Sequence, residues 1–210
     1  MLELAALAPL KTGNLRAIYQ HPARADLLVK VIRREAFERR FVRGSWLKRV
    51  PRALHYTGYV RELKEYLALR ARAPDALAPV ARMVGIVETD LGVGLVSEKV
   101  VDAGGLLAPS LHAICRRDRG VPAWAEAALA QFLDELLRVN VIVGDLHAGN
   151  IVHGSDSRGG APRFILVDGF GEKNVVPFNS MSRWRNRRHT LHQFRRLRRE
   201  LAELAAAPGI

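Results

Sequence analysis

Apolar residues in the first half of the chain recur in short runs that turn residues interrupt, which is typical of antiparallel strands. We expect strands over residues 4–10, 15–19 and 27–32, followed by an antiparallel pair over 80–88 and 94–101. Gly13-Asn14, Pro22 and Thr89-Asp90-Leu91-Gly92 supply the turns between them. The pattern therefore predicts a five-stranded antiparallel sheet.

Three longer stretches carry apolar residues three and four positions apart, which predicts helices over 58–73, 122–138 and 183–206. Pro122 suits the first turn of the second helix. In the last helix Leu191, Phe194, Leu197 and Leu201 fall on one side, so we expect that side to pack on the body of the protein. The stretch 172–182 is predicted to be a loop.

A β-hairpin is predicted where two apolar runs, 151–152 and 164–167, flank the turn-rich segment 154–160. Asp145 and Asn150 lie just before the first run, and Asp168 directly follows the second. Because these strand ends meet in a hairpin, we expect the three side chains to converge. Phosphoryl transfer uses such a cluster: one carboxylate orients or deprotonates the attacking hydroxyl, while Asn and Asp hold magnesium.

Lys30 lies in the middle of an apolar run that is predicted to be buried on both faces. A buried lysine needs a carboxylate or a phosphate as a partner. Glu62 and Glu65 of the following helix are the available carboxylates; we select Glu62 and keep Glu65 as the alternative. Lys30 could instead lie on an edge strand and extend its ammonium group to water.

The length of 210 residues and a hydrophobic fraction of 49% fit one domain or two small lobes with a sizeable core. No apolar run reaches the roughly 18 residues of a transmembrane helix, and the first residues lack the basic start of a secretory signal. A single cysteine, Cys115, cannot form an internal disulfide, so we expect it to pack in the core. These features favour a cytoplasmic protein.

A net charge of +12 implies an acidic partner. Arginines cluster at 33–52 and 183–199, and the second cluster is interleaved with Trp184, Phe194 and leucines at helical spacing. That interleaving favours a docked helix with a solvated basic face over a nucleic-acid-binding module. An anionic membrane surface or a phosphorylated acceptor would suit the basic face.

The spacing from Asp145 to Asn150, followed by Asp168-Gly169, resembles the catalytic and metal loops of the protein-kinase-like superfamily. The form Gly-Asp-Leu-His-x-Gly-Asn is closer to the aminoglycoside and choline kinase branch. Across nearly its whole length, the chain resembles the YrbL family, small bacterial kinase-like proteins named for the PhoP regulatory network. This resemblance rests on 9–13 with Lys30, 61–64, 87–94, and Asp168 with 171–172.

The resemblance implies a two-lobed α+β fold of the protein-kinase type. Its N-lobe would span 1–101, with a five-stranded antiparallel sheet and a basic insertion at about 33–57. A reduced, mainly helical C-lobe would span 102–210. The implied activity is phosphoryl transfer from magnesium-ATP to an unidentified acidic or hydroxyl-bearing acceptor. The implied site residues are Asp145 for the acceptor, Asn150 and Asp168 for Mg²⁺, Lys30 steadied by Glu62 for the phosphates, Gly13 for close backbone approach, and Glu98 and Val100 for the base.

The chain departs from the kinase pattern at several positions. Gly13 is the one glycine of the phosphate-covering loop, Val143 replaces the usual histidine, and the metal loop 168–171 is one residue longer than Asp-Phe-Gly. The C-lobe is too short for peptide-docking helices. An ATP-binding regulator without turnover therefore stays open as an alternative. His147 could line the acceptor side or belong to a surface turn.

Overall fold

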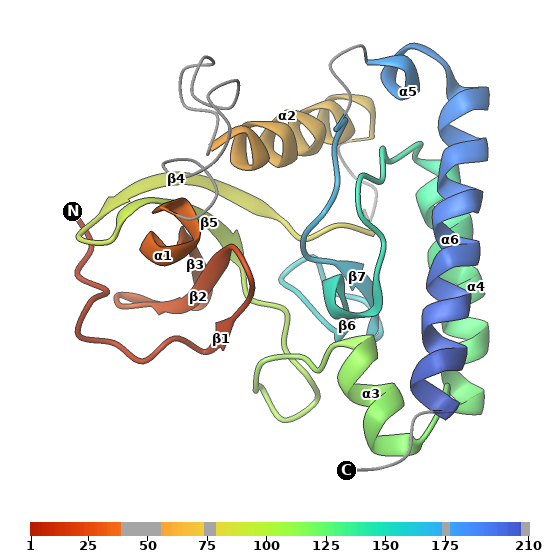
Figure 1. Cartoon of the computed structure of the whole chain (residues 1–210), viewed down its shortest axis with the longest axis horizontal. Coiled ribbons are helices and arrows are strands. Elements are labelled where there is room, and N and C mark those ends of the chain that lie inside the picture. The colour runs from red at the N-terminus through yellow and green to blue at the C-terminus, as the bar shows by residue number, and fades with distance from the viewer. Residues whose placement is uncertain (39–55, 74–78, 174–176, 207–210) are drawn as a thin grey trace. The chain divides into compact units, whose positions relative to one another are not determined.

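The computed structural model describes residues 1–38, 56–73, 79–173 and 177–206, so most of the basic insertion predicted at 33–57 lies outside the described residues. The chain has a mixed α+β architecture with one five-stranded antiparallel sheet and several helices (Figure 1). It divides into two compact units, Met1–Leu63 with Arg82–Lys99 and Lys64–Ala81 with Val100–Ile210. Helix α2 runs through the boundary between Leu63 and Lys64.

The first unit contains the five-stranded sheet, in the order β1-β2-β3-β5-β4. All neighbouring strands are antiparallel, as the sequence predicts. The strands are β1 (Lys11–Thr12), β2 (Arg16–His21), β3 (Arg24–Ile32), β4 (Met83–Thr89) and β5 (Gly92–Glu98).

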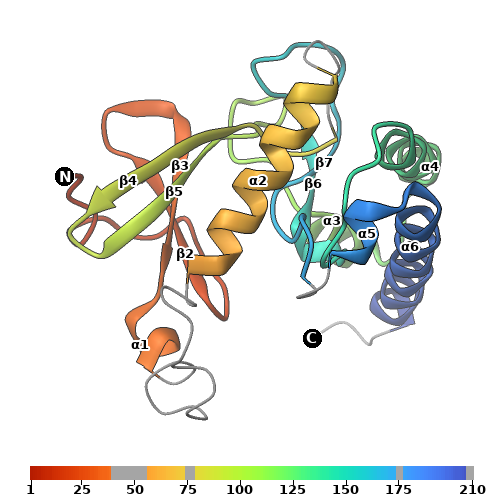
Figure 2. The same ribbon diagram turned by 90° about the horizontal axis from the view of Figure 1, so that it is seen from above.

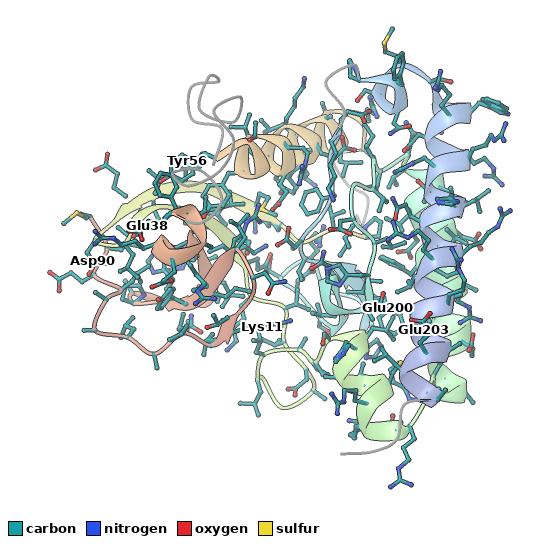
Figure 3. All side chains as sticks on the ribbon, viewed as in Figure 1. Lys11, Glu38, Tyr56, Asp90, Glu200 and Glu203 are labelled. Atoms are coloured by element: carbon teal, nitrogen blue, oxygen red, sulfur yellow. The ribbon has the colours of Figure 1, made fainter. Side chains whose placement is uncertain are left out.

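The predicted first strand over 4–10 is wrong, because β1 is confined to Lys11–Thr12. A side-chain clamp takes the place of a strand ladder. The Asp90 carboxylate accepts hydrogen bonds from the backbone N–H groups of Leu4 and Ala5 at 2.8 and 3.0 Å (Asp90 is labelled in Figure 3). These bonds lower the pKa of Asp90, and they hold Leu4 completely buried in the core.

Alternate residues of β3 lie on opposite faces of the sheet. Leu4 packs with Leu27, Val29 and Val31 on one face. Lys30 lies between these residues in β3 and therefore belongs to the opposite face. A short helix, α1 (Arg34–Phe37), follows β3, and α2 (Thr57–Arg72) begins after the undescribed stretch.

The second unit is mainly helical, with α3 (Leu111–Asp118), α4 (Ala123–Arg138), α5 (Phe178–Met181) and α6 (Arg183–Ala206). Helices α4 and α6 lie side by side (Figures 1 and 2). The hairpin pairs β6 (Ile151–Gly154) with β7 (Arg163–Leu166), as predicted. Helix α3 was not predicted, and α5 occupies part of the stretch expected to be a loop. Cys115 lies in α3 and is completely buried, as expected, and burial raises its pKa.

Helix α6 has the predicted bounds but a more polar buried side than predicted. Leu197 and Leu201 are buried, as expected, whereas Leu191 and Phe194 are only partly buried. The buried positions follow a spacing of three and four, and they are Asn186, Thr190, Gln193, Leu197 and Leu201. The prediction missed the polar members because hydrophobic periodicity alone cannot identify polar residues on a buried side.

A buried ion cluster fixes the turn of the hairpin. The Asp156 side chain is 1% exposed and pairs with Arg158 and, at 2.9 Å, with Arg163. Arg158 also donates to the Val80 carbonyl at 2.8 Å. Burial alone would raise the pKa of Asp156, but the hydrogen bonds and charges of the two arginines outweigh it and lower the pKa.

Replacing Asp156 with Asn should lower the free energy of unfolding by about 3 kcal/mol, because two largely buried guanidinium groups lose their counter-ion. The stabilisation that ionised Asp156 provides should be complete above about pH 4, the ordinary aspartate pKa. It should be lost as the pH falls through the lowered pKa of Asp156. Urea unfolding at several pH values measures both effects. Asp118→Asn, which breaks an exposed pair with Arg117, is the control and should change little. Equal losses of unfolding free energy in Asp156→Asn and Asp118→Asn would contradict this account.

Candidate functional site

Two loops of the second unit pair through their backbones at the ends of the hairpin strands. The Gly144 and Asp145 N–H groups both donate to the Gly169 carbonyl, at 2.8 and 2.7 Å. In return, Gly171 N–H donates to the Ile142 carbonyl at 2.7 Å. The segment that carries Asp145 and the segment that follows Asp168 are thus held together by hydrogen bonds.

Gly169 lies at the point where these loops touch. Its φ of +81° favours glycine, and a Cβ atom added there would lie 2.5 Å from the Asp145 carbonyl oxygen. The same atom would lie 2.9 Å from Asn150 Nδ2. Only glycine allows this approach of the two backbones. The loops that carry Asp145, Asn150 and Asp168 therefore meet in one small volume, as the hairpin pattern predicts.

Hydrogen bonds hold two polar side chains of this site in place, those of Asn150 and Asp168. Asn150 Nδ2 donates to the Asp145 carbonyl at 3.2 Å, which leaves the amide oxygen for another partner. The Asn150 carbonyl accepts from Val167 N–H at 2.8 Å, which ties Asn150 to the end of β7. Asp168 Oδ1 accepts from Gly169 N–H at 2.6 Å.

The donor set at these loops fits magnesium, which prefers carboxylate and amide oxygens and keeps further positions for phosphates and water. Asp168 and Asn150 supply one oxygen of each kind. Among the described residues, no group of three or more His, Cys, Asp or Glu side chains could hold a metal.

Lys173 is a member of the site that the sequence did not indicate. Its Nζ lies 3.2 Å from Asp145 Oδ2, and both side chains are about half exposed. Lys173 lies five residues after Asp168, so the same loop that carries the predicted metal ligand brings a cation to the predicted base. Its position just after the predicted metal loop, 168–171, was the available signal.

The first unit contains Lys30, which is 3% exposed, as its place in a buried strand predicts. The Tyr59 hydroxyl of α2 donates to the Lys30 carbonyl at 2.7 Å. Glu62 of the same helix is fully buried and forms an ion pair with Arg16 at 2.8 Å. The role of Arg16 was not predicted, and the pairing of Lys30 with Glu62 stays a prediction.

Glu65 belongs to the part of α2 in the second unit. Its Oε1 accepts a hydrogen bond from Ile142 N–H at 2.9 Å, just before the loop that carries Asp145. Burial raises the pKa of Glu65, and this hydrogen bond opposes the rise. Glu65 therefore supports the segment that leads to Asp145.

The predicted nucleotide contacts lie at three backbone positions. Gly13 is in the turn between β1 and β2, where its N–H donates to the Arg16 carbonyl at 2.8 Å. Glu98, at the end of β5, and Val100 are both buried. The carbonyl of Val100 accepts from Ala108 N–H at 3.0 Å. Contact of these residues with ATP stays a prediction.

Helix α6 holds the loop that carries Asp145. Its side chains bond to the backbone of this loop at three points. These contacts are Asn186 Nδ2 to the Val141 carbonyl at 2.9 Å, His189 Nε2 with the Val143 carbonyl at 3.0 Å, and the Glu200 carboxylate with Ala148 N–H at 3.2 Å. Within the loop itself, His147 Nδ1 accepts from Gly149 N–H at 3.1 Å, which is the arrangement of a capped turn.

The family model described as PhoP regulatory network protein YrbL matches residues 2–202. The chain belongs to the YrbL family. Among curated relatives, the uncharacterized protein YrbL of Escherichia coli strain K12 is 28% identical over 192 residues, which cover 88% of this chain and 80% of that protein. The YrbL protein of Shigella flexneri matches with the same identity and coverage. Among the described residues of this YrbL-family chain, no helix is both long and apolar enough to cross a membrane.

Replacing Glu200 with Ala in this YrbL-family protein should loosen the loop at 145–150, because Ala148 N–H loses a charged acceptor. Amide hydrogen exchange should become faster there, while the melting temperature falls by only a few degrees. Glu203→Ala, on the same helix, is the matched control and should leave exchange of the loop unchanged (both residues are labelled in Figure 3). Unaltered exchange in Glu200→Ala would contradict a supporting role for this contact.

Proposed function

We propose that this YrbL-family protein is a magnesium-ATP-dependent phosphotransferase that acts on a hydroxyl acceptor. In this proposal the two units correspond to the N- and C-lobes of a reduced protein-kinase-like fold. The observation that carries it is the contact at Gly169, which brings Asp145, Asn150 and Asp168 onto adjoining loops. Carboxylate and amide oxygens at this spacing suit phosphoryl transfer.

The proposed residues divide the work of transfer among them. Asp145 accepts the proton of the attacking hydroxyl or orients that hydroxyl. The Asn150 amide oxygen and the Asp168 carboxylate would hold Mg²⁺, which supplies charge neutralisation at the phosphates when bound. Lys30, with Glu62, positions the phosphates.

Lys173 extends this assignment, because its ammonium group lies beside Asp145. A cation there would attract a phosphoryl group. The family description links these proteins to the PhoP regulatory network. We propose that phosphoryl transfer, or ATP binding alone, serves that network in this chain.

A second candidate is an ATP-binding regulator without turnover. The ion pair between Lys173 and Asp145 favours it, since a carboxylate engaged with an ammonium group is less available to a hydroxyl. The two candidates differ in phosphate release and transfer.

Incubating the protein with γ-labelled ATP, magnesium and a panel of hydroxyl-bearing metabolites separates these two candidates. Labelled product, or hydrolysis that depends on magnesium, is expected for the enzyme. ATP binding with neither product would identify the regulator. Absence of binding as well would exclude both.

A further inference from the structure

The outer side of α6 is strongly basic. Eight arginines and no acidic residue occupy 183–199, and all eight arginines are exposed. With Leu197 at the centre of the buried side, Arg188, Arg195 and Arg199 lie nearly opposite at helical spacing. We call these three residues the arginine stripe; it extends for about 16 Å along the helix, from the rise of about 1.5 Å per residue.

Exposed apolar side chains gather at the N-terminal end of the same helix. Phe178 and Met181 of α5 and Trp184 of α6, here called the apolar tip, are 45%, 75% and 64% exposed. Helix α5 packs against α6, and Arg188 of the arginine stripe lies over the Trp184 ring, so the tip adjoins the stripe. Two arginines stack on its rings, Arg185 on Phe178 at 4.7 Å and Arg188 on Trp184 at 4.8 Å.

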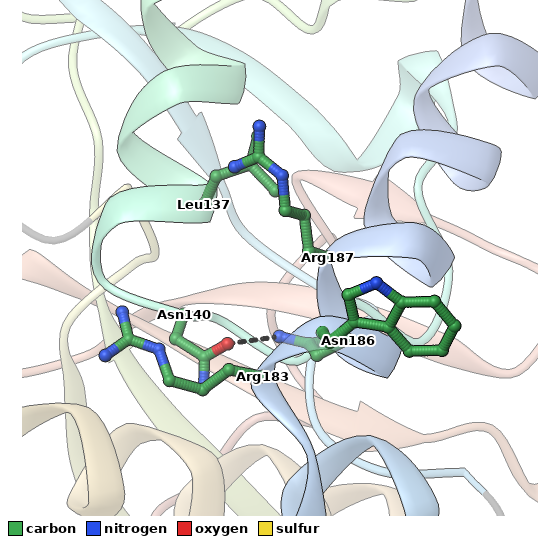
Figure 4. Close-up of a pocket in the computed structure, with 6 residues that line it drawn as sticks. Leu137, Asn140, Arg183, Asn186 and Arg187 are labelled. Atoms are coloured by element: carbon green, nitrogen blue, oxygen red, sulfur yellow. Dashed lines mark hydrogen bonds between the residues drawn. The ribbon is translucent and has the colours of Figure 1, made fainter.

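A small pocket of about 180 Å³ lies beside the tip. It is formed where α4 ends and α6 begins, and Arg183 and Arg187 supply two guanidinium groups to its lining (Figure 4). Asn186 fixes one wall by donating to Asn140 Oδ1 at 3.0 Å. Because Asn186 belongs to the buried side of α6, the pocket lies toward that side and not on the side of the arginine stripe.

We propose that this side of α6 docks on the surface of an anionic phospholipid bilayer. The apolar tip would insert at the level of the headgroups, and the arginine stripe would face the negative surface. Tryptophan and neighbouring apolar side chains are favoured at that boundary, where one side is apolar and the other hydrated. A basic helix beside such side chains is typical of surface-bound helices.

The same features weigh against nucleic acid as the partner. The phosphate backbone would satisfy the arginines but would leave Met181 and Phe178 in water. A bilayer surface satisfies both sets of side chains. This docking is independent of ATP binding, because none of its residues belongs to the loops around Asp145.

Sedimentation of the full chain with vesicles tests this inference. We expect binding to vesicles of phosphatidylglycerol and phosphatidylcholine, and little binding to phosphatidylcholine alone. Arg195→Glu with Arg199→Glu should weaken binding by at least about 30-fold, since each basic residue near an anionic surface contributes about fivefold. Both side chains are exposed, so the melting temperature should be nearly unchanged.

A second variant and a matched control separate apolar insertion from net charge. Met181→Ser with Trp184→Ser should weaken binding in high salt as well as low salt, because apolar burial is not screened. Lys64→Glu with Arg116→Glu changes the net charge by the same amount at exposed positions on other helices and should retain binding. The inference would be overturned if this control lost as much vesicle binding as Arg195→Glu with Arg199→Glu. Binding of the wild type to a DNA duplex but not to anionic vesicles would also overturn it.

Discussion

Gly169→Ala should abolish magnesium-ATP binding and reduce any turnover by about 10²-fold or more, the usual consequence of displacing a reacting group by about 1 Å. The added methyl group would lie 2.5 Å from the Asp145 carbonyl and 2.9 Å from Asn150 Nδ2. The two loops must separate to admit it, because backbone atoms cannot rotate away as a flexible side chain can. Calorimetric titration and turnover measurements report the loss.

Gly159→Ala is the matched control for this change. Gly159 also has a positive φ, +78°, so alanine there meets the same backbone strain. No described atom lies within 4 Å of its added Cβ, so steric overlap is absent. Both variants should lose about 1–2 kcal/mol of stability from the left-handed backbone, but only Gly169→Ala should lose the ability to bind ATP. Similar ATP affinities in the two variants would show that the contact at Gly169 does not organise the site.

Asp145→Asn should lower the rate of phosphoryl transfer by about 10²–10⁴-fold, the range for loss of general-base assistance. The amide retains the size of the side chain but cannot accept the hydroxyl proton. Affinity for magnesium-ATP should survive, because the magnesium ligands are assigned to Asn150 and Asp168. Single-turnover kinetics with labelled ATP separates the chemical step from binding.

Asp134→Asn removes one negative charge from the exposed surface of α4 and is the control for Asp145→Asn. It should leave both rate and affinity unchanged. If Asp145→Asn turned over ATP as fast as the wild type, Asp145 would not be the base. If binding were lost instead of turnover, Asp145 would be a magnesium ligand.

Local patterns predicted most of the elements. The apolar runs located β2, β3, β4 and β5, and periodicity placed α4 and α6 to within a residue at each end. The prediction failed at 4–10, where Asp90, distant in sequence, binds the backbone of Leu4 and replaces a strand partner. Helix α3 was missed because it is short, although Ser110 caps it by accepting from Ala113 N–H.

The candidate site likewise combines features that depend on local order, which were predictable, with contacts between residues distant in sequence, which were not. The meeting of the loops that carry Asp145, Asn150 and Asp168 was predicted because these residues lie at the ends of one hairpin, where local order alone brings the loops together. The contact of Glu200 with Ala148 spans 52 positions, and no local pattern indicates it. Arg16 was missed for a similar reason, since its ion pair with Glu62 requires α2 to pack on the sheet.

Titration of magnesium-ATP into the wild type and Asp168→Ala tests the central claim most directly. The wild type should bind ATP in a magnesium-dependent manner, and its melting temperature should rise, because a ligand that binds only the folded state stabilises it. Asp168→Ala should lose the magnesium-dependent part of both signals. No binding by the folded wild type in saturating magnesium-ATP, or the same magnesium dependence in Asp168→Ala, would contradict the assignment of this site to phosphoryl transfer.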